Sequence, residues 1–217
     1  MNKLTSDDYK RLRHNAIVLA DDEYGDKVLL LTDQSIVKLF RVKRLISSAN
    51  FYSPARRFAK NATKLQNLSI PTVSILSLYK ITAIKRTAVH YQQLQGETVR
   101  DYILAGKSTD VFFQKLGQFL AHLHELGIFF RSAHLGNIVF TPEKTFGLID
   151  ISDMKIYKSS LNKNKRLRNL KHIFRVSEDL ELLKDNDLIE KSYLSHCSIT
   201  NKKFHLDFLN KAKKLKS

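Results

Sequence analysis

Short apolar blocks separated by polar turns dominate the first 95 residues of the chain. Blocks of this length, bounded by Asp, Gly, Gln or Pro, are typical of β-strands. The pattern predicts strands over residues 16–20, 27–32, 35–41, 73–79 and 87–94. One longer block, 51–68, has Phe58, Ala62 and Leu65 at helical spacing and Pro54 near its start, so it predicts a helix inserted between the third and fourth strands.

Apolar positions in the rest of the chain are mostly three or four residues apart, which predicts helices. A short helix is expected over 98–104 and a strong one over 110–126, with Asp110 as its cap and Gly127 as its stop. Two short apolar blocks, 138–140 and 146–149, flank the turn 141–144 and predict a β-hairpin. Everything after Lys163 is expected to be helical.

The segment FRSAHLGNIV, residues 130–139, is followed by LID at residues 148–150, on the predicted hairpin. Kinase active sites have the pattern H-R-D-x-x-x-x-N followed by D-F-G, in which the Asn and the second Asp hold metal ions. Asn137 and Asp150 occupy these two positions, and Ser132 stands where the first Asp is expected. The spacing therefore favours a kinase layout that lacks the usual catalytic aspartate.

This layout, together with the predicted elements, indicates an α+β, bilobal protein-kinase-like fold. A small antiparallel-sheet N-lobe is expected over residues 1–95, and a mostly helical C-lobe with a basic substrate segment over 96–217. The segment 92–96, which ends at Gly96, is the candidate hinge.

Asn137 and Asp150 are the predicted ligands of Mg²⁺, because an amide oxygen and a carboxylate suit a hard cation that also takes phosphate oxygens. A turn role for Asn137 and a capping role for Asp150 are the structural alternatives. Ser132 and His134 are the predicted catalytic residues, and one of them is expected to line the acceptor site. Ser132 cannot act as a base at neutral pH without an activator, so His134 is the candidate proton acceptor or phosphate contact. A structural role in the loop is the alternative for His134. Arg131 is predicted to contact an anion or to anchor the loop.

Lys38 lies in the apolar block IVKLF and is predicted to hold the phosphates of ATP. The alternative is an edge-strand lysine that faces solvent. Its usual partner is a glutamate on the following helix, but residues 34–96 contain no Asp or Glu. The turn 21–26, at the place of a phosphate-binding loop, has four acidic residues and one glycine, so it predicts weak, metal-dependent nucleotide binding.

The run FFRSAHLGNI, with the HLGN motif and the LID strand, resembles the lipopolysaccharide core kinases and the bacterial group labelled toluene tolerance proteins. The resemblance covers about residues 15–180 and is strongest over 124–150. It implies a kinase that uses ATP and Mg²⁺ to phosphorylate a sugar of the lipopolysaccharide core.

Charge points to an anionic partner. The formal net charge is +16, and residues 154–177 form a second acid-free stretch where a kinase has its substrate segment. We expect the lipopolysaccharide core, another phosphorylated glycolipid or the anionic inner-membrane surface to bind there. A generally basic, solvated surface is the plainer alternative. The predicted substrate-binding residues are Arg131, Lys163, Lys165, Arg166 and Arg168.

Three functions follow from the sequence. The first is a kinase, and the second is a catalytically impaired pseudokinase that acts as a binding or regulatory module. The third, a nucleic-acid-binding protein, rests on charge alone, because no basic and aromatic motif of that class is present. One cysteine excludes an internal disulfide framework. The polar N-terminus has no apolar signal segment, so a cytoplasmic protein, peripheral on the inner membrane, is expected.

Overall fold

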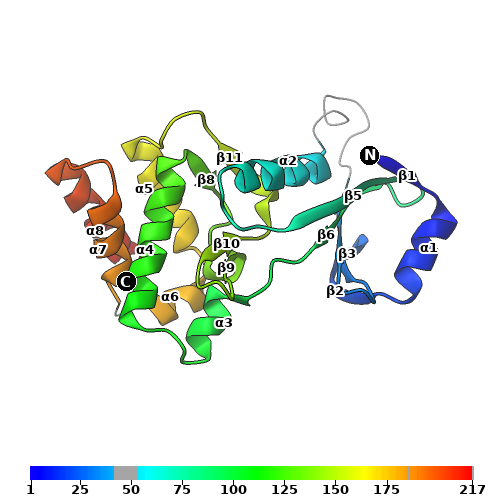
Figure 1. Cartoon of the computed structure of the whole chain (residues 1–217), viewed down its shortest axis with the longest axis horizontal. Coiled ribbons are helices and arrows are strands. Elements are labelled where there is room, and N and C mark those ends of the chain that lie inside the picture. The colour runs from blue at the N-terminus through cyan, green and yellow to red at the C-terminus, as the bar shows by residue number, and fades with distance from the viewer. Residues whose placement is uncertain (42–52, 185, 217) are drawn as a thin grey trace. The chain divides into compact units, whose positions relative to one another are not determined.

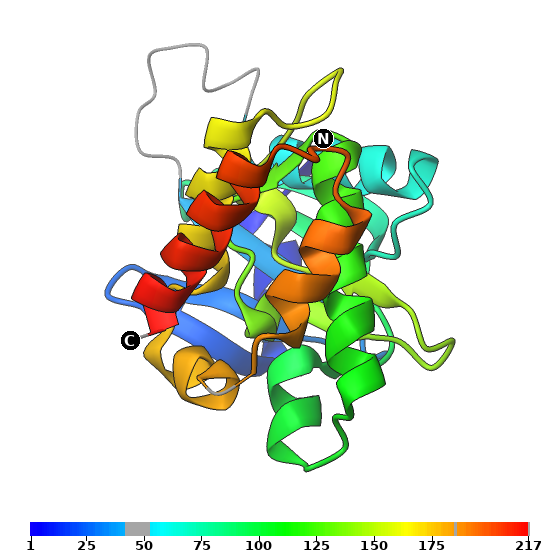
Figure 2. The same ribbon diagram turned by 90° about the vertical axis from the view of Figure 1, so that its left-hand side faces the viewer.

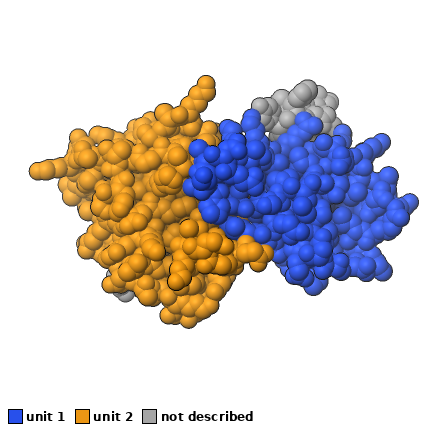
Figure 3. Space-filling view, viewed as in Figure 1, with its two compact units in different colours: residues 1–94 blue, residues 95–217 orange. Residues whose placement is uncertain are grey.

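The computed structural model describes residues 1–41, 53–184 and 186–216. The chain divides into two compact units, Met1–Leu94 and Gln95–Ser217 (Figure 3). The boundary lies within the predicted hinge segment 92–96 and one residue before the expected division at 95/96.

The described residues of the first unit form a six-stranded sheet with two helices (Figure 1). Its elements are β1 Asn2–Leu4, α1 Ser6–His14, β2 Ile17–Asp22, β3 Gly25–Leu30, β4 Ile36–Arg41, α2 Pro54–Asn67, β5 Ser74–Ile81 and β6 Arg86–Gln92. The strand order is β1-β5-β6-β4-β3-β2, and every pair is antiparallel except β1 with β5. This sheet contains the five predicted strands and adds β1, which the sequence pattern did not reveal.

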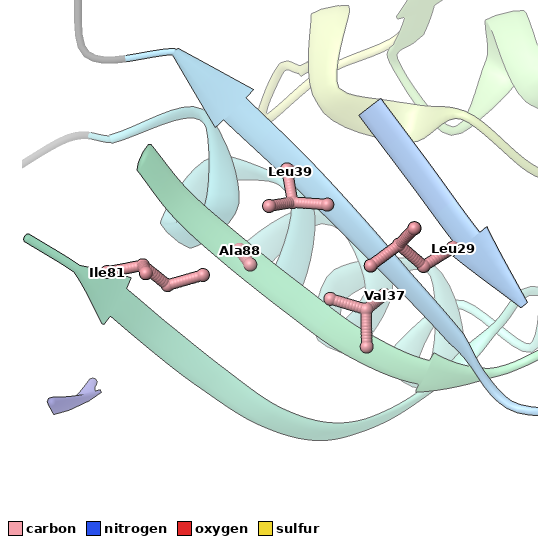
Figure 4. Packing of buried hydrophobic residues seen from close by; sticks show 5 residues of the cluster. All are labelled: Leu29, Val37, Leu39, Ile81 and Ala88. Atoms are coloured by element: carbon pink, nitrogen blue, oxygen red, sulfur yellow. The ribbon is translucent and has the colours of Figure 1, made fainter. Parts of the chain in front are cut away.

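Side chains alternate between the two faces of this sheet along each strand, and apolar side chains are buried on both faces. Figure 4 shows one cluster, made of Leu29, Val37, Leu39, Ile81 and Ala88. Tyr9 and Leu12 of α1 pack against that cluster. Phe58 of α2 is fully buried and contacts Phe40 and Tyr91.

The second unit is mostly helical (Figures 1 and 2). Its helices are α3 Val99–Leu104, α4 Asp110–Glu125, α5 Lys163–Ile173, α6 Ser177–Leu183, α7 Leu188–His196 and α8 Lys202–Lys216. Figure 2 shows α8, in red, beside α5 and α7.

Short strands connect these helices and carry the loop of interest. They are β7 Glu97–Thr98, β8 Ile128–Phe130, β9 Ile138–Phe140, β10 Phe146–Leu148 and β11 Met154–Ile156, with the 3-10 turns η2 Leu135–Asn137 and η3 Ile151–Asp153. The strands β10, β9 and β7 form one small sheet, and β11 pairs with β8 in another.

Most predicted elements are present with small shifts at their ends. The cap of α4 is a correction, because the side chain of Thr109, and not Asp110, accepts a hydrogen bond from the backbone of Phe112. The predicted start of the inserted helix at 51 lies outside the described residues, and α2 begins at Pro54. The helix α1 and the pair β8–β11 were not predicted.

The predicted fold class is confirmed, since a small, mostly antiparallel sheet unit is followed by a mostly helical unit with a β-hairpin. Among the described residues, no helix is both long and apolar enough to cross a membrane.

Candidate functional site

The loop of residues 131–137 is held at both ends by buried side chains of the second unit. Asn169, on α5, accepts a hydrogen bond from the backbone N–H of Phe130 at 3.1 Å and donates one to its carbonyl at 2.9 Å. Asn169 is 1% exposed. Its side-chain amide therefore satisfies both backbone groups of Phe130, as a neighbouring strand would do. The loop therefore leaves β8 in a fixed direction.

Asp179, on α6, fixes the other end of the loop. Its carboxylate is fully buried, accepts from the backbone N–H of Leu135 at 2.8 Å and pairs with Nε of Arg100 at 2.6 Å. A buried carboxylate is tolerated only when it is paired and hydrogen-bonded, and both conditions are met here. A Cβ added at Gly136 would lie 3.3 Å from the guanidinium carbon of Arg100, so the loop packs closely on this ion pair.

The side chain of Asn137 is fixed inside the loop. Its Nδ2 donates to the carbonyl of Ser132 and to Nε2 of His134, both at 2.9 Å. Both amide hydrogens are then used, which makes Oδ1 the atom that can bind a cation. The backbone N–H of Ile149 donates to the carbonyl of Asn137 at 3.0 Å, so the residue before Asp150 is tied directly to Asn137.

Asp150 follows β10 in a left-handed conformation, with φ 50° and ψ 48°. A non-glycine residue in this region is strained, and such strain is concentrated at functional sites. Its half-buried side chain makes no capping hydrogen bond to η3, so the alternative role of a helix cap is not observed.

Asn137 and Asp150 are thus adjacent and offer oxygen ligands. Magnesium is commonly bound by one or two protein oxygens together with water and phosphate oxygens. This donor set fits Mg²⁺ bound with a nucleotide. The described residues contain no group of three or more His, Cys, Asp or Glu side chains that could hold a metal alone.

The position of His134 argues against its predicted role as proton acceptor. Its Nε2 faces the Nδ2 donor of Asn137, and its Nδ1 is buried without a partner among the described residues. Burial lowers the pKa of His134, so the neutral ring that can accept from Asn137 is favoured. The ring therefore orients Asn137, which favours the structural alternative for His134, and its role as proton acceptor or phosphate contact stays a prediction.

Arg131 and Ser132 are the first two residues of the same loop. Ser132 is half-buried, and its carbonyl is taken by Asn137. Arg131 is exposed. Both roles, in the acceptor site and in anion contact, stay predictions.

The turn at residues 21–26 is locked by the first unit's own residues. Arg86 is 4% exposed and donates to the carbonyl of Tyr24 at 2.7 Å and to Asp22 at 3.4 Å. The guanidinium of Arg41 lies 3.4 Å above the ring of Tyr24. This turn is an internally bonded hairpin, so its backbone is not arranged as a phosphate cradle.

Lys38 lies on β4 between β3 and β6, so the edge-strand alternative is wrong. It is half-buried and belongs to the first unit, whereas the loop belongs to the second. Its role as a phosphate contact stays a prediction. Lys43 and Arg44, in the acid-free stretch 34–96, lie outside the described residues.

The predicted substrate-binding role of Arg166 is wrong. This residue is fully buried and donates to the carbonyl of Leu161 at 2.6 Å and to Glu125 at 2.8 Å. Burial raises the pKa of Glu125, but hydrogen bonds from Arg166 and Ser198 outweigh it and lower that pKa to about 2. Arg166 is an internal ion-pair partner and cannot contact a substrate or a membrane.

The other predicted cations of α5 remain accessible. Lys163 and Arg168 are exposed, and Lys165 is half-buried with its ammonium 4.0 Å from the ring centre of Tyr157. The sequence carried a signal that separates Arg166 from them, because Arg166, Leu170 and Ile173 share one helical face.

Asn169, Asp179 and Arg100 were missed by the sequence analysis. Their partners lie 39, 44 and 79 residues away, and neither their spacing nor their type marks them as site residues. The one signal in the sequence concerns Asp179, because Glu178 and Asp179 are the first acidic residues after the acid-free stretch 154–177.

No protein-family model and no curated protein matches this chain. A structure of WbdD with a kinase inhibitor matches 87% of this chain at 15% identity, with a TM-score of 0.49. A structure of the bifunctional kinase-methyltransferase WbdD matches 85% at 13% identity, with a TM-score of 0.46. This chain spans 42% and 46% of those two chains, and at these identities the likeness concerns the fold alone.

Proposed function

We propose that this protein is a kinase-like phosphotransferase that moves the γ-phosphate of ATP to a sugar hydroxyl of the lipopolysaccharide core. The proposal rests on the arrangement of Asn137 and Asp150. The side chain of Asn137 is held by hydrogen bonds within the loop, and its carbonyl accepts from the backbone N–H of Ile149. The next residue is Asp150, in its strained left-handed conformation. A hairpin that presents an amide oxygen and a carboxylate together is suited to a magnesium nucleotide.

The reaction breaks the bond between the γ-phosphorus and the β,γ-bridging oxygen, forms a bond to the sugar oxygen, and releases ADP and a proton. Magnesium, when bound, neutralises charge on the phosphate oxygens. Asn137 and Asp150 are the residues that would hold it, and His134 keeps Asn137 in the required orientation.

No side chain of the loop is placed as a strong base. The half-buried Ser132 hydroxyl is proposed to line the acceptor site and to orient the sugar hydroxyl. Phosphoryl transfer has a loose transition state, and its catalysis is mainly positioning and charge neutralisation, so a reaction without an aspartate base is chemically reasonable. The proton would then leave to water.

Calorimetry with ATP and Mg²⁺ tests the proposal. We expect weak binding that requires metal and is lost in Asp150→Ala. Asp153→Ala is the matched control, because Asp153 is an exposed carboxylate three residues further along η3. An Asp150→Ala variant that binds as well as the parent would refute the assigned site, as would submicromolar binding without metal.

A pseudokinase is the second candidate. Two observations favour it, namely Ser132 at the aspartate position and the hairpin turn that Arg86 locks. In that case the protein binds nucleotide or partner at the anionic membrane face and transfers nothing. Labelled ATP and a panel of core oligosaccharides separate the two, since label on any sugar supports the kinase and binding without transfer supports the pseudokinase.

A further inference from the structure

Three elements that pack beside the loop carry no acidic residue. The strands β8 and β11 are paired, and α5 is bonded to β8 through Asn169. None of these elements contains Asp or Glu, although they lie in a folded, tightly packed part of the second unit. Four basic residues gather here, which we name the cationic cluster: Arg131, Arg168, His172 and Arg175.

The geometry of β8 and α5 brings these residues together. Asn169 holds Phe130, so Arg131 leaves β8 directly beside α5. Arg168 and His172 are four residues apart and share one face of α5, and Arg175 follows its end. The rings of His172 and of Phe129, on β8, are perpendicular, with ring centres 5.7 Å apart.

The pKa of His172 depends on its burial and on the positive charges of the other three residues in the cluster. Burial, and then the positive charges of Arg131, Arg175 and Arg168, lower its pKa. Its Nδ1 is buried and has no hydrogen-bond partner among the described residues. The imidazole of His172 therefore lies in the electrostatic field of three guanidinium groups, and its Nδ1 has no hydrogen-bond partner among the described residues.

The two acidic residues that follow the cluster along the chain, Glu178 and Asp179, are both paired with Arg100. Asp179 is already bonded through one oxygen to Arg100 and through the other to the backbone of Leu135. Arg131, Arg168 and Arg175 are all exposed. Arg131 is the first residue of the candidate active loop, and Asn169 of α5 holds the residue before it, so the cluster lies beside that loop.

We propose that the cationic cluster binds a phosphate monoester carried by the acceptor, a substrate class that rests on the proposed function. Guanidinium groups match phosphate oxygens with paired hydrogen bonds, and several of them converging are typical of phosphate recognition. A nucleic acid would instead require a longer basic track with aromatic stacking surfaces. The acceptor is thus a sugar that already bears phosphate near the hydroxyl to be modified.

Binding of glucose 6-phosphate and of glucose, followed by NMR chemical shifts without nucleotide or metal, tests this site. We expect the sugar phosphate to bind and glucose not to bind. Arg168→Gln with Arg175→Gln should weaken binding at least about tenfold, because two charge-assisted contacts are lost. The control pair is Lys115→Gln with Lys144→Gln, which removes two exposed cations from α4 and the β9–β10 turn and should leave binding unchanged.

Equal weakening by the control pair would overturn the proposal, because it would show diffuse attraction to net charge. Full binding by Arg168→Lys with Arg175→Lys would overturn recognition by paired guanidinium contacts. Asp150→Ala should still bind glucose 6-phosphate, so failure of the nucleotide site and failure of this site give different results. If the parent protein binds Mg²⁺ and ATP but not the sugar phosphate, the cluster proposal fails alone.

Discussion

At the scale of single residues, the amide of Asn137 depends on its neighbour His134. The hydrogen bond from Nδ2 to Nε2 uses the lone pair that a general base would need. His134→Ala should weaken metal-dependent ATP binding, and His134→Gln, which keeps an acceptor, should restore part of it. Any transfer activity should show no rise with pH through the usual pKa of histidine. Activity that follows such a titration and is lost in His134→Ala would restore the base assignment.

A second residue-scale prediction concerns His124, which is 2% exposed and bonded to the hydroxyl of Tyr193. Burial, followed by the charge of Arg166, lowers the pKa of His124 to about 3. An unfolded histidine titrates near 6.5, so below that pH the unfolded chain binds more protons than the folded one. The free energy of unfolding should therefore fall on acidification, by about 2 kcal/mol for this histidine between pH 7 and pH 5.

Denaturant unfolding, followed by circular dichroism at both pH values, measures this effect. His124→Phe should show a smaller difference between the two pH values, and His14→Gln, at an exposed site of α1, should keep the full difference. Burial also lowers the pKa of His134, His172 and His90, so part of the pH effect should remain. An unchanged difference in His124→Phe would contradict the prediction.

At the scale of elements, α4 and α7 approach each other at Gly117. A Cβ there would lie 2.3 Å from the carbonyl oxygen of Ile189 and 3.0 Å from the Cβ of Ser192. Gly117→Ala should therefore force the helices apart at a cost of about 1–3 kcal/mol or more. The gain in helix propensity is only about 1 kcal/mol, so it does not offset a clash with backbone.

The midpoint of thermal or denaturant unfolding tests this packing. Gln118→Ala, at an exposed position of the same helix, should change stability by no more than about 0.5 kcal/mol. A Gly117→Ala protein as stable as the parent would show that α4 and α7 are not in close contact.

At the scale of the whole molecule, the net charge of +16 predicts salt-sensitive binding to anionic membranes. Because Arg166 is buried, the predicted cations of α5 that remain accessible are Lys163, Lys165 and Arg168, and Lys171 of the same helix is exposed as well. Each cation near an anionic surface contributes about 1 kcal/mol. Reversing the three predicted cations to Glu should therefore reduce sedimentation with phosphatidylserine vesicles strongly.

The control for this experiment changes net charge by the same amount at Lys3, Lys27 and Lys80, which are exposed in the first unit. It should keep most of the binding. Equal losses in the two triple variants would show that overall charge, and not α5, determines the association. Binding that is insensitive to high salt would reject electrostatic attachment altogether.

The sequence by itself determined the features that depend on neighbouring residues. Strands and helices follow from the period of their apolar positions, and the pair Asn137 and Asp150 follows from one short hairpin between them. The acid-free stretch also identified the basic face of α5, because charge is a property of composition. The distance along the chain is small in each of these cases, so local patterns contain the needed information.

Only the tertiary structure decided what surrounds each side chain. The apolar face of α5 already indicated that Arg166 is buried, but only the folded chain shows that it is bonded to Glu125 of α4. Asp179 and Asn169 hold the loop through contacts that span 44 and 39 residues. Such contacts form because distant segments pack together, and that packing sets hydrogen-bond partners and pKa, which no local pattern of polar and apolar residues encodes.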